Sequence, residues 1–371
     1  MLIGIDASRS VTAQRTGTEY YSLHLIRSLL PLDRLHRYRL YFNQAPSEGL
    51  YPVSDRVQEV LIPCPRLWTH TRLSWETNRR APDVLFIPAH VLPLVHPERS
   101  VVTIHDLGYL HYPEAHTRWA RWYLDRSTRF NARQASHIIA DSHATRRDLM
   151  NHYQVPEKRI TVVYPGGGGR LRPVSDENHL KDVRERYGLP DRYLLYLGTI
   201  QPRKNLKRLL EAYKLLVHSS QGDGPGLVIA GKKGWLYESI FRRASDLGLG
   251  DRVVFPGYVA ASDVSTLMSA ATAFVLPSLY EGFGFPALEA MSCGTPVVCS
   301  NVSALPEVVG DAALLVDPLD VHELSDSMRR IVADGKLRDT LRERGFRRAA
   351  GFSWGRCARE VLNVIEMVGR S

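Results

Sequence analysis

Short apolar runs recur along the whole chain, and stretches with helical spacing of apolar residues separate them. Each run has the length and β-prone composition of a buried strand. The runs lie at 2–7, 37–42, 57–62, 84–88, 100–106, 137–142, 160–165, 193–198, 226–231, 253–256, 273–277, 296–299 and 313–316. Alternation of this kind predicts an α/β protein with mainly parallel sheets and helices on both faces of each sheet.

The chain has 371 residues, which is too many for one ordinary core and fits two domains. A stretch of four consecutive glycines, between Pro165 and Arg170, follows the seventh apolar run and predicts a hinge. We therefore expect two doubly wound, Rossmann-like domains, 1–170 and 171–352, that face each other across a cleft. A final helix over 353–371, capped by Ser353, is expected to cross back to the first domain.

The composition, 44% apolar and 23% charged, is that of a globular protein rather than a disordered one. No apolar run approaches the ~20 residues of a membrane helix. A strand-like run begins at Leu2, so we expect no signal peptide. The four cysteines lack CxxC or zinc spacing. These features indicate a cytoplasmic protein with reduced thiols.

The segment from Glu281 to Glu289 carries the most specific signal for function. An apolar run precedes it, and Gly282-Phe283-Gly284-Phe285 leads to Pro286, which we expect to be the first residue of a helix. Glycines allow backbone amides to approach a ligand, and a helix N-terminus favours anionic oxygens. A carboxylate on each side of this turn suits the diols of sugars. The combination predicts a sugar nucleotide, whereas the simpler interpretation is a core helix with two solvated glutamates.

Two cations follow the apolar run at 193–198, in the sequence Pro202-Arg203-Lys204. This position is the carboxyl edge of a predicted sheet, beside the start of a helix expected over 205–217, and α/β proteins bind ligands there. Arg203 and Lys204 would neutralise a diphosphate and stabilise it as it leaves. A solvated basic loop is the alternative interpretation.

His105 ends another strand-like run, where it could orient a reacting hydroxyl or serve as a structural histidine. Gly17, in the sequence Arg15-Thr16-Gly17-Thr18, is a weaker candidate for bringing backbone amides near phosphate or acceptor. The stretch 226–233 matches a P-loop only up to its lysine and is itself strand-like, which argues against triphosphate hydrolysis. No Asp-x-Asp or metal-ligand spacing occurs, so we predict no metal site and no cofactor.

The net charge is +9, and the first 170 residues carry most of it, with 22 Lys and Arg against 15 Asp and Glu. A predicted helix within 116–134 interleaves arginines with Trp119, Trp122 and Tyr123. Basic residues mixed with aromatics suit an anionic membrane surface. A solvated face whose aromatics pack on the domain is the equal alternative. Nucleic acid is not expected as a partner, because no recognised binding module accompanies the charge.

Together, these motifs resemble the retaining glycosyltransferases of family 4, which have the GT-B fold. The strand, Glu281, the Gly-Phe-Gly-Phe-Pro turn and Glu289 resemble the E-x7-E element of that family. The segments 198–205 and 103–114 resemble branches that act as bacterial polysaccharide mannosyl- or related hexosyltransferases. The similarity covers nearly the whole chain. One departure is Thr199, where many relatives carry arginine directly after the glycine, and Arg203 is expected to supply that charge.

The resemblance assigns roles to particular residues. Glu281 would contact hydroxyls of the donor hexose, Glu289 the nucleotide ribose and Lys204 the donor diphosphate. His105 would line the reaction centre, and Gly17 the acceptor-side loop near the phosphates. The remaining residues expected to bind the donor lie in the glycine turn, in the phosphate segment and beside the base: Gly282, Phe283, Gly284, Thr199, Gly257, Tyr258 and Val259.

The sequence thus predicts a hexosyltransferase that uses a nucleoside diphosphate sugar, retains the anomeric configuration and needs no metal. The donor is expected on the second domain, and a glycan or lipid-linked acceptor on the first. The protein would be cytoplasmic, with peripheral contact at the inner face of the membrane. Two alternatives remain at this point: a sugar-nucleotide epimerase on the same fold, and a non-catalytic protein that binds sugar nucleotides.

Overall fold

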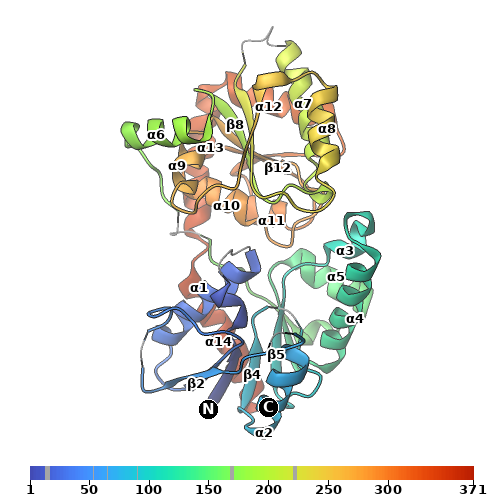
Figure 1. The fold of residues 1–371 in the computed structure, drawn as a ribbon, viewed down its shortest axis with the longest axis vertical. Coiled ribbons are helices and arrows are strands. Elements are labelled where there is room, and N and C mark those ends of the chain that lie inside the picture. The colour runs from blue at the N-terminus through green and yellow to red at the C-terminus, as the bar shows by residue number, and fades with distance from the viewer. Residues whose placement is uncertain (13–16, 53, 65, 90, 168–170, 220–223) are drawn as a thin grey trace. The chain divides into compact units, whose positions relative to one another are not determined.

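The computed structural model describes residues 1–371 except 13–16, 53, 65, 90, 168–170 and 220–223. The chain divides into two compact units, each built on its own sheet (Figure 1). The first comprises Met1–Tyr109, His116–Gly166 and Phe352–Ser371, and the second Leu110–Ala115 and Gly167–Gly351. Part of the predicted hinge, Gly168 to Arg170, lies outside the described residues, as do Arg15 and Thr16 beside Gly17.

The sheet of the first unit has seven strands in the order β3-β2-β1-β4-β5-β6-β7, and all neighbours are parallel. The bounds are β1 (Leu2–Asp6), β2 (Arg37–Phe42), β3 (Val57–Leu61), β4 (Val84–Ile87), β5 (Ser100–Ile104), β6 (His137–Ala140) and β7 (Ile160–Val162). Every predicted run of the first half forms a strand. The prediction succeeds because central parallel strands are covered on both faces and their sequences are continuously apolar.

The helices of the chain's first part are α1 (Gly17–Leu32), α2 (Ser74–Arg79), α3 (Gly108–His111), α4 (Arg118–Gln134) and α5 (His143–Tyr153). The side chain of Thr117 caps α4, and that of Ser142 caps α5. A π-helical turn, Thr69–Leu73, comes directly before the short α2.

The last helix, α14 (Trp354–Arg370), belongs to the first unit. Its buried residues, among them Val361 and Ile365, join the core formed by β1 and α1 around Ile3 and Tyr21. Figure 1 shows this red helix beside the blue N-terminal strand and helix. The Ser353 side chain accepts a hydrogen bond from the Arg356 amide and caps the helix, as predicted. The N- and C-terminal segments therefore fold as one body.

The second unit has a six-stranded parallel sheet in the order β10-β9-β8-β11-β12-β13. Its strands are β8 (Tyr193–Leu197), β9 (Gly226–Ala230), β10 (Val253–Gly257), β11 (Ala273–Leu276), β12 (Val297–Ser300) and β13 (Ala313–Val316). Its helices are α6 (Glu177–Tyr187), α7 (Leu206–Ser219), α8 (Glu238–Asp246), α9 (Val264–Ser269), α10 (Phe285–Ser292), α11 (Leu305–Val309), α12 (Val321–Ala333) and α13 (Gly335–Ala350). The P-loop-like stretch forms β9, as its apolar residues predict.

Strand order reverses once in each sheet, between β1 and β4 in the first unit and between β8 and β11 in the second. At such a point the loops that follow neighbouring strands diverge to opposite faces of the sheet. They leave an opening at the carboxyl edge, where open α/β sheets bind their ligands. The topology therefore marks the loops after β8 and β11, and those after β1 and β4, as candidate sites.

Candidate active site

The two predicted donor motifs are the loops at the reversal of the second sheet. The loop after β8 runs from Gly198 into a 3₁₀ turn, Pro202–Lys204, and the loop after β11 contains Glu281. Asn205 ends the 3₁₀ turn in the left-handed conformation, with φ of 59°, which asparagine tolerates better than most residues. Its side-chain amide donates to the Pro277 carbonyl at 3.0 Å and thereby ties the two loops together.

Glu281 forms a buried ion pair with the basic turn. Its Oε1 accepts hydrogen bonds from the Lys204 Nζ at 2.5 Å and from the Ser278 hydroxyl at 2.6 Å. Arg203 lies 3.7 Å from Oε2 and also donates to the Tyr280 carbonyl. Burial alone would raise the pKa of Glu281, but the charges of Lys204 and Arg203 outweigh it and hold that pKa below its usual range. The site therefore contains an ionised carboxylate and two cations.

The glycine turn leads from Glu281 into α10, which begins at Phe285. Gly284 has φ of 112°, a backbone conformation that L side chains rarely adopt, so the position favours glycine. Pro286 is the second helical residue rather than the predicted first, because α10 begins at Phe285. The Glu281 amide donates to the Ser303 hydroxyl at 2.9 Å, which fixes the start of the turn. Ser278 and Ser303 lie outside every motif that the sequence revealed.

The other predicted donor residues also lie in the second unit. Glu289 is on α10, half-buried, while Gly282 and Phe283 are buried within the turn. The Thr199 carbonyl accepts a hydrogen bond from the Tyr196 hydroxyl at 3.1 Å. The predicted base-flanking residues lie at and just after the end of β10: Gly257, its last residue, has φ of 78°, Tyr258 is exposed and Val259 is buried.

His105 follows β5 in the first unit and makes hydrogen bonds through both ring nitrogens. Nδ1 lies 2.6 Å from Oδ2 of Asp141, at the end of the neighbouring β6, and Nε2 lies 3.0 Å from the Pro88 carbonyl. Burial lowers the pKa of His105, but the Asp141 charge and hydrogen bond raise it further, so the net shift is upward. The arrangement holds the ring in one orientation. Sequence reasoning did not identify Asp141, because only the sheet order makes the ends of β5 and β6 neighbours.

Comparison with known proteins identifies the family. Residues 16–166 match the family described as Glycosyltransferase Family 4, and residues 181–348 match Glycosyl transferases group 1. The chain is 32% identical to O-antigen chain mannosyltransferase B from Escherichia coli, over 98% of this chain and 99% of that relative. The chain belongs to glycosyltransferase family 4. The enzyme activity that the motifs predicted is thereby confirmed at the level of glycosyl transfer.

Solved structures share the fold of this glycosyltransferase. Sucrose-phosphate synthase from Thermosynechococcus elongatus has a TM-score of 0.76 at 21% identity, over 99% of this chain and 98% of that one. Anabaena HepE, solved with UDP and glucose, has a TM-score of 0.75 at 18% identity, over 98% of this chain and 99% of that one. These likenesses confirm the predicted GT-B fold.

In the first unit of the glycosyltransferase, α4 carries its basic and aromatic side chains outward. Trp119, Trp122 and Tyr123 are 72%, 51% and 45% exposed. The two indole rings stack on each other, with centroids 4.9 Å apart, and the Arg126 guanidinium lies over Trp122. The aromatics are thus partly exposed and partly packed: Tyr123 also lines a cavity of the first unit, and Phe130 is half-buried against His96. Within the described residues, no helix is both long and apolar enough to span a membrane.

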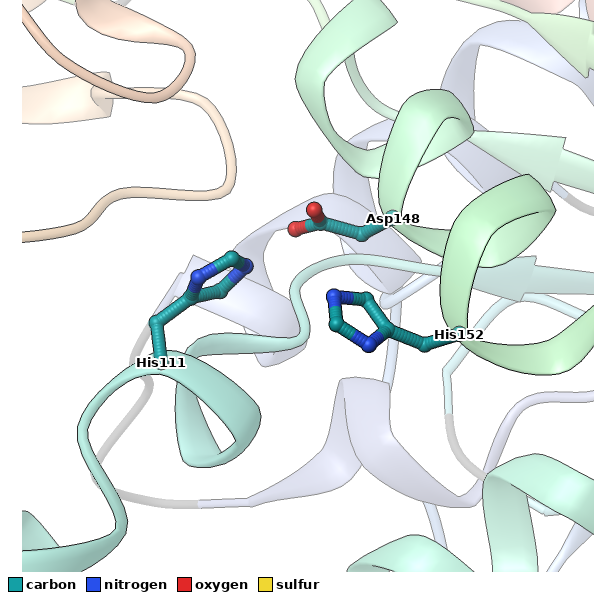
Figure 2. Close-up of side chains that lie close together, drawn as sticks. All are labelled: His111, Asp148 and His152. Atoms are coloured by element: carbon teal, nitrogen blue, oxygen red, sulfur yellow. The ribbon is translucent and has the colours of Figure 1, made fainter.

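Gly17 is the first residue of α1 and is exposed. Among the described residues, His111, Asp148 and His152 offer possible metal-ligating atoms that all lie within 4.8 Å of one another. Asp148 and His152 are one turn apart on α5, and His111 ends α3 (Figure 2). We assign no metal site to these side chains, because residues 110–115 and α5 belong to different units.

Proposed function

We propose that this glycosyltransferase moves a hexose, mannose or a similar sugar, from a nucleoside diphosphate sugar to a hydroxyl of a glycan or lipid-linked saccharide. The reaction would serve the synthesis of a cell-surface polysaccharide. Two relatives support the substrate class: one is named an O-antigen chain mannosyltransferase, and a structure with the same fold was solved with UDP and glucose.

The observation that carries the proposal is the cluster of Lys204, Arg203 and Glu281 at the reversal of the second sheet. Two cations beside one carboxylate leave an excess of one positive charge in the loops that precede α7 and α10. A leaving diphosphate gains negative charge in the transition state, and fixed positive groups in a water-poor site stabilise that charge. We assign the diphosphate to Lys204 and Arg203.

The same ion pair suits Glu281 for orienting a sugar. Its Oε1 already accepts hydrogen bonds from Lys204 and Ser278, while Oε2 lies toward Arg203 at a longer distance. A carboxylate has about four acceptor positions, so it has capacity for hexose hydroxyls. Glu289, eight residues later on α10, would bind the ribose. We nominate neither glutamate as a covalent nucleophile.

We further propose retention at the anomeric carbon and a reaction that needs no metal ion. The cations of the basic turn would offset the diphosphate charge that a divalent metal offsets in other transferases. A diphosphate oxygen would take the proton of the acceptor hydroxyl as the new glycosidic bond forms on the same face of the sugar. His105, held by Asp141, would line the reaction centre.

A donor panel tests this proposal. We expect one hexose attached to guanosine or uridine diphosphate to release nucleoside diphosphate only with a saccharide acceptor, equally with and without a chelator. Proton NMR of the product would show the donor's anomeric configuration. A new sugar isomer formed from donor alone would instead establish an epimerase. Binding without release of diphosphate with any acceptor would establish a non-catalytic protein.

The Glu289→Ala variant sharpens the donor assignment. Hydrogen bonds to a charged group contribute ~1.5–3 kcal/mol, so the loss should reduce donor use by roughly 10–100-fold. Unchanged donor use would remove Glu289 from the ribose site.

We also propose that α4 docks on an anionic membrane. Stacked, exposed tryptophans among exposed arginines supply both apolar insertion and attraction to acidic headgroups. A W119S/W122S variant should lose most binding to vesicles that contain phosphatidylglycerol, measured by co-sedimentation. Trp75, an exposed tryptophan on α2, provides the control variant Trp75→Ser. An equal loss in both variants would contradict docking through α4.

A further inference from the structure

The segment that carries His105 is held at both ends by one helix, α5. This segment follows β5 and runs from His105 to Tyr109, at the start of α3. In the first turn of α5, the Thr145 hydroxyl donates to the His105 carbonyl at 3.2 Å. At the last residue of α5, the Tyr153 hydroxyl lies 2.7 Å from the Tyr109 hydroxyl. The two contacts fix the first and the last residue of the segment.

The Tyr109 hydroxyl begins a chain of hydrogen bonds that ends on a carboxylate of α4. Tyr153 donates to Oδ1 of Asp125 at 2.8 Å. Because a tyrosine hydroxyl has only one proton, the oxygen of Tyr153 must accept the hydrogen bond that joins it to Tyr109. Both hydroxyls keep their protons at physiological pH, since burial raises the pKa of Tyr109 to about 12 and also raises the pKa of Tyr153. The chain therefore runs in one direction, from Tyr109 to Asp125.

The carboxylate at the end of this chain is itself held on α4. Nη2 of Arg129, one turn after Asp125, lies 3.4 Å from both carboxylate oxygens. The same guanidinium lies over the Tyr153 ring, 5.5 Å from its centroid. Hydrogen bonds to an ionised group are roughly twice as strong as neutral ones, and neighbours in a chain polarise one another. The cluster thus fixes Tyr153 through its hydroxyl and its ring.

Tyr109 stands where the segment most needs an anchor. Its side chain is only 3% exposed, and it is the last residue of the first unit before Leu110–Ala115, which belong to the second unit. Apolar burial is non-directional and would let the ring shift, whereas a hydrogen bond fixes the position of its hydroxyl. The chain of hydrogen bonds therefore sets where the segment ends.

We propose that Tyr153 and Asp125 are positioning residues for glycosyl transfer, which hold the segment from His105 to Tyr109 in the place that the reaction requires. The inference rests on the proposed function, in which His105 lines the reaction centre. A misplacement of about 1 Å can lower a rate by up to about 100-fold, so even a small release of this segment should slow the chemical step. Neither residue belongs to a motif that the sequence revealed.

The test measures turnover in Tyr153→Phe, which removes only a hydroxyl. Turnover at saturating donor and acceptor should fall roughly 3–10-fold, as the loss of one hydrogen bond predicts, while KM for the donor stays unchanged. Tyr109→Phe should act in the same way, and the double variant should be no slower than Tyr153→Phe, because the same hydrogen bond is lost. Asp125→Asn keeps an acceptor and should lose less turnover than Asp125→Leu.

Tyr38→Phe is the matched control in the first unit. Tyr38, near the amino end of β2, also donates from a buried hydroxyl to a carboxylate, that of Asp33. This variant should lose thermal stability, as Tyr153→Phe does, and keep wild-type turnover. An equal loss of turnover in Tyr38→Phe would show that any weakened hydrogen bond in the unit slows the enzyme, and the proposal would be wrong. Wild-type turnover in Tyr153→Phe would also overturn it.

Hydrogen exchange separates this proposal from the proposed function, because it needs no reaction. Measured by mass spectrometry on the full chain, exchange over residues 105–109 should be faster in Tyr153→Phe than in the wild type and unchanged in Tyr38→Phe. If the wild type transfers no sugar from any donor, the proposed function fails, and faster exchange in Tyr153→Phe would still support the anchor. Slower turnover with unchanged exchange would overturn the proposal, because Tyr153 would then act in another way.

Discussion

The two sheets present different kinds of chemistry at their carboxyl edges. At the reversal of the second sheet, Lys204, Arg203 and Glu281 are charged, close together and paired with one another. At the edge of the first sheet, a cavity at β1 and β2 has a mixed lining, in which Asp6 and Arg9 stand beside neutral polar and aromatic side chains. The ion pair at the edge of the second sheet is satisfied within the protein before any ligand binds.

The difference matches the ligands that we expect on the two units. A nucleoside diphosphate sugar carries its own charge, so its site needs fixed cations, and in our proposal Glu281 would hold Lys204 and Arg203 in position before the donor binds. A saccharide is neutral and offers many hydroxyls, so its site needs hydrogen-bonding groups more than fixed charges. Loss of a charge beside Glu281 should therefore slow turnover more than loss of a hydrogen bond at the segment after β5.

The largest effect is expected from Lys204→Met, which removes the charge and retains the apolar stem. Turnover should fall roughly 100- to 1,000-fold, because a fixed donor to the developing anion is lost. Steady-state kinetics with saturating donor and acceptor measure it. Lys207→Met, an exposed lysine on α7, is the matched control and should be nearly silent. Unchanged turnover in Lys204→Met would show that the cations at the edge of the second sheet do not act in catalysis. The difference that we draw between the two sheet edges would then be wrong.

Much of the fold could be predicted from the sequence, because buried parallel strands leave continuous apolar runs. All the strands were located, with bounds within a few residues. Helix starts were less accurate: α7 begins at Leu206 because Asn205 is left-handed, and α10 begins one residue before the expected position. Such details depend on local backbone conformation, which apolar periodicity does not encode.

The candidate site was predictable where its residues lie within one motif and unpredictable where sheet order brings them together. Glu281, Gly284 and Lys204 stand in recognisable segments. Ser278 and Ser303 do not, and both support Glu281 through contacts that depend on folded loops. Asp141 supports His105 only because β5 and β6 are neighbours. The chain of hydrogen bonds from Tyr109 to Asp125 joins distant segments and left no sequence signal.

A smaller effect is expected from Glu281→Gln, which keeps the shape and removes the charge. Donor use should fall roughly 10–100-fold, through weaker hydrogen bonds to the hexose and loss of the attraction that holds Lys204. The folded-state pKa of Glu281 lies below its unfolded value, so the stability that it contributes is present above about pH 4.3. That stability is lost as the pH falls through the folded pKa.

The free energy of unfolding, measured with urea between about pH 3 and 6, should therefore decline less steeply with falling pH in Glu281→Gln than in the wild type. Glu185→Gln, which breaks an exposed pair with Lys181, is the control. It should change neither activity nor the decline of the unfolding free energy at acid pH. If the unfolding free energy declined equally with falling pH in Glu281→Gln and in the wild type, the buried pair would not be charged.

The smallest effect is expected from His105→Gln, through the pH dependence of stability. The folded-state pKa of His105 is raised, so its contribution is fully present below the unfolded value of about 6.5 and declines as the pH rises through the folded pKa. The unfolding free energy of the wild type should therefore fall with rising pH in that window, and the slope should flatten in His105→Gln. His137→Gln is the control: burial lowers the pKa of His137, so that variant should retain the alkaline decline. A turnover loss far larger than the change in stability would show that His105 acts in the reaction centre. In that case the first unit, like the second, would contribute a charged group to catalysis, and the two sheet edges would differ less than we propose.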